Sequence, residues 1–248
     1  MTAEIRLGDW RDSVRGLATV GPVDHLITDT PFSPHVHNNC RTLAKGVGAV
    51  DVGFDSFTDE DRDQLCAVTG SLVRRWHIIF TDFESVGAWR DAMERHNIEF
   101  IRTGVWIKIG GMPQISGDRP AAGAEAIVIG HALNAKGKPQ RKRWNGGGSH
   151  AVYRCAAPPS GAQRHPTQKP LELLERLILD FTAHGETIVD THAGSGTTLC
   201  AAARRGRRAI GWELQPRWVR VARKRIKSTH EQLDWTDASQ MNAVSQSS

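Results

Sequence analysis

The stretch "ETIVDTHAGSGTTLCAAARRG" (186–206) decides the fold class, because it places a short strand, a glycine turn and a helix of small residues in direct succession. Gly194 and Gly196 let the backbone approach a ligand without a Cβ clash. The helix after them directs free N–H groups toward the same place. Glu213 ends the following strand, about 20 residues on, where an acid meets ribose hydroxyls in a doubly wound fold. The pattern favours a nucleoside-bearing cofactor, and the alternative is an ordinary tight turn.

Strand-like and helix-like segments alternate along the rest of the chain. Short apolar runs predict strands at 23–28, 76–82, 103–109, 125–131 and 207–213. Helical patterns predict helices at 59–75 and 85–97, and further helices opened by Pro170 and Pro216. This alternation is typical of an α/β fold with a doubly wound, mostly parallel sheet. We predict a single domain over residues 1–232, with a small irregular insertion at about 132–165 and a flexible tail over 233–248.

Composition limits the chain to one sizeable domain with a mild positive charge. Its 248 residues are 39% hydrophobic, and the formal net charge is +5, which favours a polyanionic partner. No apolar stretch resembles a signal peptide or reaches membrane length. We therefore expect a cytoplasmic location and no membrane partner.

The cysteine spacing indicates neither a disulfide framework nor a metal site. Cys40, Cys66, Cys155 and Cys200 form no CxxC pair, so we expect four free thiols in a reducing compartment. A zinc site built from Cys40 and the histidines at 35 and 37 is conceivable, but no second half with ligand spacing follows. We predict no metal.

The residues around the glycine turn discriminate between cofactors. Asp190 precedes the turn at the carboxyl end of its strand. A carboxylate there repels a pyrophosphate and attracts an ammonium or sulfonium group. The GxGxxG pattern is also incomplete, because Thr198 and Leu199 occupy its last positions. Both observations favour S-adenosylmethionine over NAD.

A second unusual strand end occurs in "HLITDTPFSPH" (25–35), where an apolar run stops at Asp29-Thr30-Pro31-Phe32. A carboxylate, a rigid proline and an aromatic ring at the end of a strand suit a flat ligand with a polar edge. The alternative is that Asp29 caps a turn and Phe32 joins the core.

Four segments, in this order, resemble the amino-DNA methyltransferases, which methylate adenine N6 or cytosine N4. They are "IRLGDW" (5–10), "DTPF" (29–32), "HPTQKPLELLERLI" (165–178) and "DTHAGSGTTLCAAARRGRRAIGWEL" (190–214). The catalytic motif precedes the cofactor motif, as in the circularly permuted β group. The resemblance covers roughly residues 5–230 and implies a Rossmann-like S-adenosylmethionine-dependent fold that acts on double-stranded DNA.

The resemblance also implies roles for individual residues. Glu213 would bind the ribose hydroxyls, Asp9 would approach the adenine amine, and Gln168 and Lys169 would lie by the methionine carboxylate. The full set of implied cofactor residues is Asp9, Asp29, Thr167, Gln168, Lys169, Asp190, His192, Ala193, Gly194, Ser195, Gly196, Thr197, Thr198 and Glu213. Two motifs depart from the family pattern. Thr30 and Thr191 replace prolines, and His192 replaces a phenylalanine.

The chemistry expected at Asp29–Phe32 is activation of an exocyclic amine. The lone pair of that amine is delocalised into the base, and two hydrogen-bond acceptors localise it and stabilise the developing positive charge. We expect the Asp29 carboxylate and the Thr30 backbone carbonyl to be these acceptors, so that the Thr30 side chain is dispensable. Pro31 fixes the turn and holds Thr30 extended. Phe32 would stack on the flipped base, which is worth about 1–3 kcal/mol.

A basic segment is the expected contact with DNA. "KGKPQRKRWNGGG" (136–148) lies between the catalytic and cofactor motifs, where the permuted family keeps its target-recognition region. The alternative is a solvated charge run. Residues 33–56 would form a loop that closes over the flipped base. The predicted DNA-binding residues are Arg41, Lys45, Lys136, Lys138, Arg141, Lys142, Arg143 and Trp144.

We therefore predict a site-specific DNA methyltransferase that uses S-adenosylmethionine. An aspartate at the first motif position favours adenine N6, because many N4-cytosine enzymes of the family carry serine there. The short recognition segment implies a short target or a homodimer. The alternatives are cytosine N4 methylation, methylation of another planar amine in RNA or on a protein glutamine, a catalytically inactive DNA-binding protein, and an NAD oxidoreductase.

Overall fold

A computed structural model describes residues 2–11, 20–33, 56–111, 117, 120–158 and 168–245 of the chain. It has an eight-stranded sheet with the order β1-β8-β7-β2-β3-β5-β4-β6. The strands are β1 (Ala3–Leu7), β2 (His25–Asp29), β3 (Trp76–Thr81), β4 (Ile98–Ile109), β5 (Ala124–Ala132), β6 (Val152–Ala156), β7 (Thr187–Asp190) and β8 (Arg208–Glu213). The helices are α3 (Asp59–Leu72), α4 (Val86–Arg95), α5 (Leu171–Phe181), α6 (Thr197–Arg204) and α7 (Pro216–Ser245).

The sheet is mostly parallel, as predicted. Strands β1, β8, β7, β2 and β3 run in one direction, and β4 and β6 pair parallel to each other. Only β5 is antiparallel to its two neighbours among the described strands. The strand that follows β2 in the chain, β3, lies on one side of it. The strand that follows β7, β8, lies on the opposite side, with β1 at the edge beyond it. The strand order therefore reverses between β2 and β7, and in doubly wound folds the ligand crevice lies outside the carboxyl ends of the strands at such a point.

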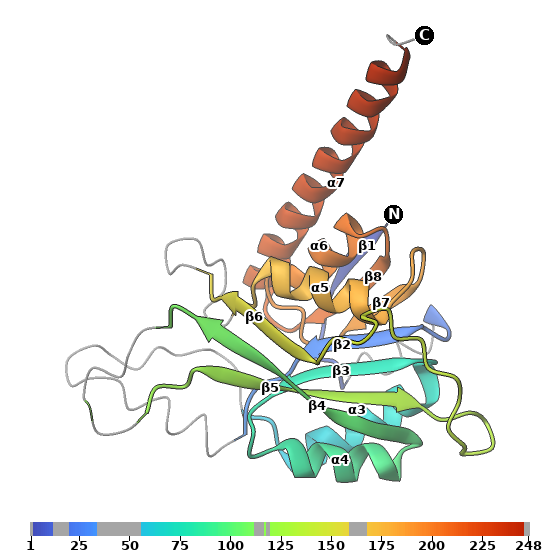
Figure 1. Ribbon diagram of the computed structural model, residues 1–248, viewed down its shortest axis with the longest axis vertical. Coiled ribbons are helices and arrows are strands. Elements are labelled where there is room, and N and C mark those ends of the chain that lie inside the picture. Colours follow the sequence, from blue (N-terminus) through green and yellow to red (C-terminus); the bar gives the residue numbers. More distant parts are fainter. Residues whose placement is uncertain are drawn as a thin grey trace.

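Helices cover both faces of the sheet, as a doubly wound fold requires (Figure 1). The helices α5, α6 and α7 pack on one face around a core that contains Leu174, Ile178 and Phe181. The helices α3 and α4 pack on the other face around a core that contains Leu65 and Trp89. The central strand β3 is buried along its whole length, because it has helices on both sides.

The helix boundaries follow local sequence signals. The Thr58 hydroxyl accepts from the Asp61 backbone N–H, and the Asp61 carboxylate accepts from the Thr58 backbone N–H, which is a capping box at the start of α3. The helix α6 begins after Gly196, whose φ of 78° lies in the left-handed region. The helix α7 starts at Pro216, as the sequence predicts.

Three predicted boundaries need correction. The strand predicted at 103–109 begins at Ile98, because β4 pairs with β5 over its full length and passes a register shift between Phe100 and Arg102. The insertion predicted as irregular contains β6, which pairs with β4 and buries Tyr153 and Cys155. The helix α7 runs to Ser245, whereas the sequence predicts that it ends before a tail at residue 233, and its far end extends well beyond the sheet (Figure 1).

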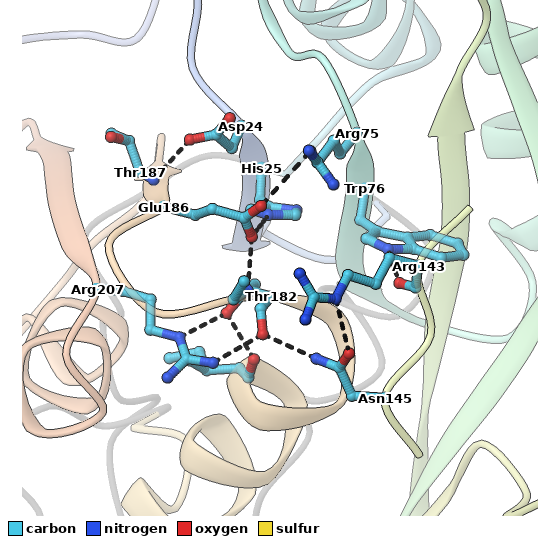
Figure 2. A network of polar contacts seen from close by, with 12 residues as sticks. Asp24, His25, Arg75, Trp76, Arg143, Asn145, Thr182, Glu186, Thr187 and Arg207 are labelled. Carbon is cyan, nitrogen blue, oxygen red and sulfur yellow. Dashed lines mark hydrogen bonds and ion pairs between the residues drawn. The ribbon is translucent and has the colours of Figure 1, made fainter. Parts of the chain in front are cut away.

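A polar network anchors the segment between β5 and β6 at the amino ends of β2, β3 and β7 (Figure 2). The Trp76 indole N–H donates to the Arg143 carbonyl over 2.8 Å. The Asn145 amide donates to the carbonyls of Leu179 and Thr182, at 2.8 and 2.9 Å. Trp144 lies edge-on to Phe181, with ring centroids 4.9 Å apart. These contacts fix the segment to the core.

The predictions of free cysteines and of no metal site can be compared with the structure only within the described ranges. Cys66, Cys155 and Cys200 are free and buried there, and Cys40 lies outside them. No group of three or more His, Cys, Asp or Glu side chains in these ranges is arranged to hold a metal ion, and the zinc ligands considered at 35–40 are not among the described residues. No helix in the described part is both long and apolar enough to cross a membrane.

The buried histidine of β3 gives the fold a predictable pH dependence. His77 is fully buried, and burial lowers its pKa to about 3. The imidazole of an unfolded chain titrates near about 6.5, so below that pH the unfolded state binds a proton that the folded state excludes. The free energy of unfolding therefore falls as the pH decreases from about 6.5 toward 3, by up to about 1.4 kcal/mol per pH unit.

We expect His77→Gln to reduce this loss. Urea unfolding at pH 7.5 and 5.5 should show a pH-dependent loss of stability about 1.4 kcal/mol smaller than in the wild type. The control is His150→Gln, at an exposed position, which should behave like the wild type. Equal pH dependence in all three proteins would contradict the assignment.

Candidate active site

The site lies at the crevice between β2 and β7, where two aspartates end adjacent strands. Asp29 ends β2 and Asp190 ends β7. The Thr28 hydroxyl of β2 donates to Asp190 Oδ1 over 2.9 Å. This buried hydrogen bond fixes the carboxyl ends of the two strands relative to each other. The motifs at 29–32 and 190–198 are therefore brought together, as the sequence predicts for one site.

The Asp29 carboxylate is paired with a buried lysine. Lys169 Nζ lies 2.6 Å from Asp29 Oδ2 and 3.1 Å from Glu125 Oε2. Three aromatic rings surround the same ammonium, with centroids 5.2 Å (Phe80), 5.8 Å (Phe32) and 6.0 Å (Trp106) away. Lys169 therefore lies against the Asp29–Phe32 motif. Its place by the methionine carboxylate, which the resemblance implies, stays a prediction.

Burial and nearby charges shift the pKa values of Asp29, Lys169 and Glu125. Burial raises the pKa of Asp29 to about 6, although the Lys169 ammonium opposes the shift. Burial alone would lower the pKa of Lys169, but the carboxylates of Asp29 and Glu125 raise it, so the ammonium stays charged. Burial would likewise raise the pKa of Glu125, but the ammonium groups of Lys169 and Lys108 lower it.

The turn after Asp29 is tied to the neighbouring strand by the side chain of Thr30. Its hydroxyl donates to the Phe80 carbonyl of β3 over 3.1 Å, and the residue is buried. The side chain therefore has a structural contact, and the expectation that the chemistry does not need it stays a prediction. The Ser33 backbone N–H donates to Asp82 Oδ2, which attaches the end of the same turn to the residue after β3.

The glycine turn has the backbone geometry that its sequence predicts. Gly194 and Gly196 have φ angles of 50° and 78°, in the region that favours glycine. The Gly194 backbone N–H donates to Glu213 Oε2 over 3.0 Å, so the acid at the end of β8 faces the turn. The Ser195 hydroxyl lies 3.3 Å from Gln168 Oε1, which brings the segment before α5 to the same turn.

Asp190 is the most enclosed acid of the turn. Oδ1 accepts from the Thr28 hydroxyl and, at 3.0 Å, from the His192 backbone N–H. Burial nevertheless raises the pKa of Asp190 to about 6. The site thus gathers carboxylates at the ends of three strands, which suits a cationic ligand and disfavours a pyrophosphate.

His192 belongs to an aromatic group beside the turn. Its ring centroid lies 5.9 Å from Trp10 and 5.4 Å from Phe57, and the Phe57 ring is edge-on to it. Burial lowers the pKa of His192 to about 3, so the imidazole is neutral and fits among the rings. The residue that replaces the family's phenylalanine therefore keeps an aromatic position. Asp9 lies in the adjoining segment and accepts from the Arg11 backbone N–H.

The predicted DNA-binding segment lies at the opposite edge of the sheet from Asp29. Because β5 is antiparallel, the residues after Ala132 emerge at the amino ends of the parallel strands. Lys142 there pairs with Glu99, and Trp144 packs on Phe181. Lys136, Lys138, Arg141 and Arg143 follow the same edge. The contact of this segment with DNA stays a prediction.

Three predicted site residues lie outside the described ranges. They are Arg41, Lys45 and Thr167. Pro31 and Phe32 are described and partly exposed at the crevice, whereas Ala193, Thr197 and Thr198 are buried under the turn.

Sequence reasoning missed residues that the fold brings to the site from other elements. Glu125 and Lys108 come from β5 and β4, and Trp106 and Phe80 form the wall around Lys169. Arg225 of α7 donates to the Ser195 carbonyl and hydroxyl, both over 2.7 Å. The available signal was the polar Glu125 and Lys108 within otherwise apolar strand patterns.

Comparisons with known proteins agree with this geometry. Residues 38–224, more than half of the chain, match the family model described as DNA methylase. Type II methyltransferase M2.DpnII of Streptococcus pneumoniae is 31% identical over 155 residues, which covers 56% of each chain. The chain thus spans a little over half the length of that relative.

Solved structures of similar proteins have the same fold. The M1.HpyAVI–SAM complex superposes with a TM-score of 0.69 at 22% identity, over 91% of this chain and 99% of that one. PvuII DNA methyltransferase, which is cytosine-N4-specific, gives a TM-score of 0.67 at 14% identity, over 93% and 91% of the two chains. The family match, the fold and the order of the motifs lead to one assignment: the chain belongs to the DNA methylase family.

Proposed function

We propose that this chain transfers a methyl group from S-adenosylmethionine to an exocyclic amine of a DNA base, with adenine N6 as the favoured target. The observation that carries the proposal is the pairing of β2 with β7, which brings Asp29-Thr30-Pro31-Phe32 and the segment that leads into the glycine turn to the same edge of the sheet. Residues 29–32 offer hydrogen-bond acceptors for an amine. The glycine turn offers a close backbone approach for the nucleoside part of a cofactor.

The residues of the turn fit the proposed cofactor. Carboxylates gather there, and two of them, Asp190 and Glu213, end neighbouring strands. Such a donor set attracts a sulfonium and repels a pyrophosphate. The partly exposed His192 ring, packed against the buried rings of Trp10 and Phe57, would offer a flat surface to an adenine ring. When bound, S-adenosylmethionine supplies the electrophilic methyl group.

Asp29 and its turn would act on the target amine. A flipped base could lie against Phe32, with one amine hydrogen on Asp29 and the other on the Thr30 carbonyl. The amine nitrogen forms the new N–C bond with its lone pair while the C–S bond breaks and its electrons stay on sulfur. The methylated nitrogen then loses a proton, and Asp29 is the nearest base for it.

The choice of adenine over cytosine rests on Asp29 itself, since the family's N4-cytosine enzymes often have serine at this position. Mass spectrometry of nucleosides from DNA treated with the chain should detect N6-methyladenine. Finding N4-methylcytosine alone would contradict the base preference and leave the reaction class intact.

We expect Asp29→Asn to reduce methyl transfer by about 100- to 1,000-fold, the usual cost of losing one preorganised electrostatic contact in a transition state. The assay is transfer of labelled methyl to duplex DNA, with cofactor affinity measured in parallel. The matched control is Asp91→Asn, an exposed aspartate that pairs with Arg90 on α4, which should keep full activity. If the wild type and Asp29→Asn bind DNA and cofactor and are equally inactive, the chain is a binding protein.

The rate of transfer should fall as the pH decreases below about 6. Asp29 is a strong, charge-assisted acceptor only when it is ionised, and its pKa is raised to about 6. The measurement is the single-turnover rate between pH 5 and 8 at saturating cofactor. Because the pKa of Asp190 is also about 6, cofactor affinity is measured at each pH. A rate that stays constant down to pH 5 would contradict the raised pKa of Asp29.

The Thr30 hydroxyl should contribute to stability more than to chemistry. Thr30→Val leaves the Phe80 carbonyl without its donor, which we expect to lower the free energy of unfolding by about 1–3 kcal/mol. Transfer measured well below the melting temperature should be retained, because the backbone carbonyl remains. The control is Thr103→Val at an exposed position of β4. Activity as low as in Asp29→Asn would show that the hydroxyl takes part in the reaction.

A further inference from the structure

Four charged side chains of alternating sign form a continuous row that starts at the catalytic aspartate. Asp29 Oδ2 lies 2.6 Å from Lys169 Nζ, which lies 3.1 Å from Glu125 Oε2. Glu125 Oε1 in turn lies 2.8 Å from Lys108 Nζ. The four residues come from β2, the segment before α5, β5 and β4. Tertiary packing alone assembles this row.

The middle of the row is buried, and its members hold one another in place. Lys169 is 7% exposed and Glu125 is 8% exposed. Charges removed from water to this extent require partners, and each of these two has one on either side. The rings of Phe80 and Trp106 close the space around the ammonium. Lys169 therefore has two defined acceptors and little freedom to leave them.

The geometry has a direct consequence for Asp29. Lys169 occupies Oδ2, which leaves Oδ1 to accept from a target amine. If Asp29 were the only partner of the ammonium, the lysine would compete with the amine for both oxygens. Glu125 also pairs with the ammonium, which weakens the pull of Lys169 on Asp29. Asp29 therefore remains a strong hydrogen-bond acceptor.

We propose that Glu125 is a positioning residue for methyl transfer, which acts by holding the Lys169 ammonium between itself and Asp29. The inference rests on the proposed function. The competing explanation is that Glu125 only neutralises a buried lysine. That explanation predicts a loss of stability in Glu125 variants without any change in the titration of Asp29.

The charges around Asp29 predict shifts of opposite sign. Lys169, Glu125 and Asp190 face its carboxylate, and Lys108 lies behind Glu125. Removing the negative charge in Glu125→Gln should move the acid limb of the rate profile to lower pH, by about half a unit or more. Removing the ammonium in Lys169→Met should move it to higher pH, by about one unit or more.

The experiment combines kinetics with a direct titration. Single-turnover transfer of labelled methyl to duplex DNA is measured from pH 5 to 8 for the wild type, Glu125→Gln, Glu125→Asp and Lys169→Met. In parallel, ¹³C-aspartate NMR of the full chain follows the Asp29 carboxylate, whose signal is assigned by its absence in Asp29→Asn. Glu125→Asp keeps the charge and should restore the wild-type limb. The matched control is Glu99→Gln, which loses a carboxylate paired with Lys142 at 2.7 Å on the far edge of the sheet.

The outcomes separate this inference from the proposed function. Opposite shifts in both measurements, with Glu99→Gln unchanged, support it. In the opposite case the wild type is active, but its acid limb and its Asp29 titration coincide with those of Glu125→Gln. That result would overturn the role proposed for Glu125 and leave the proposed function standing. An inactive wild type would overturn both, and the NMR titration would then show whether the charge arrangement exists without the activity.

Discussion

The site depends on the parallel pairing of β2 with β7, two strands that are distant in the chain. His25 lies opposite Ile188, and Leu26 lies opposite Val189. The buried hydrogen bond from Thr28 to Asp190 then fixes the ends of both strands. Because the strand order reverses here, the chain leaves the sheet in opposite directions and a crevice stays open at the carboxyl ends. Loss of this pairing would separate residues 29–32 from the glycine turn.

Within that crevice, three carboxylates are held by three different kinds of partner. Asp29 has a lysine ammonium, Asp190 has a hydroxyl and a backbone N–H, and Glu213 has backbone N–H groups. Burial raises the pKa of each, and the partners oppose that shift to different extents. Within the described ranges, only Asp29 among them has a charged side chain in direct contact, and that side chain is shared with Glu125. The electrostatic environment of Asp29 therefore depends on β5, a strand that carries no motif.

Most of the fold and part of the site could be predicted from local patterns. The glycine turn, the strand before it and Glu213 lie where the sequence places them, because turn geometry and burial periodicity are local properties. The edge of the sheet that carries the basic segment could not be predicted. Strand periodicity identifies β5 without giving its direction, and the antiparallel direction sends the residues after Ala132 to the amino edge. The contact between Lys169 and Asp29 could not be predicted either, because it depends on how separate elements pack.

The sequence by itself determined the class of the fold, the order of the motifs and the chemical types available for a reaction on an amine. These follow from residue spacing and from the conformations that glycine and proline allow or restrict. Only the tertiary structure decided which charges share the crevice. Asp29, Glu125 and Lys169 belong to separate elements, and their contact exists because β2, β3, β5 and β4 pair in that order. Electrostatic interactions depend on distance in space and on burial, and spacing along the chain specifies neither.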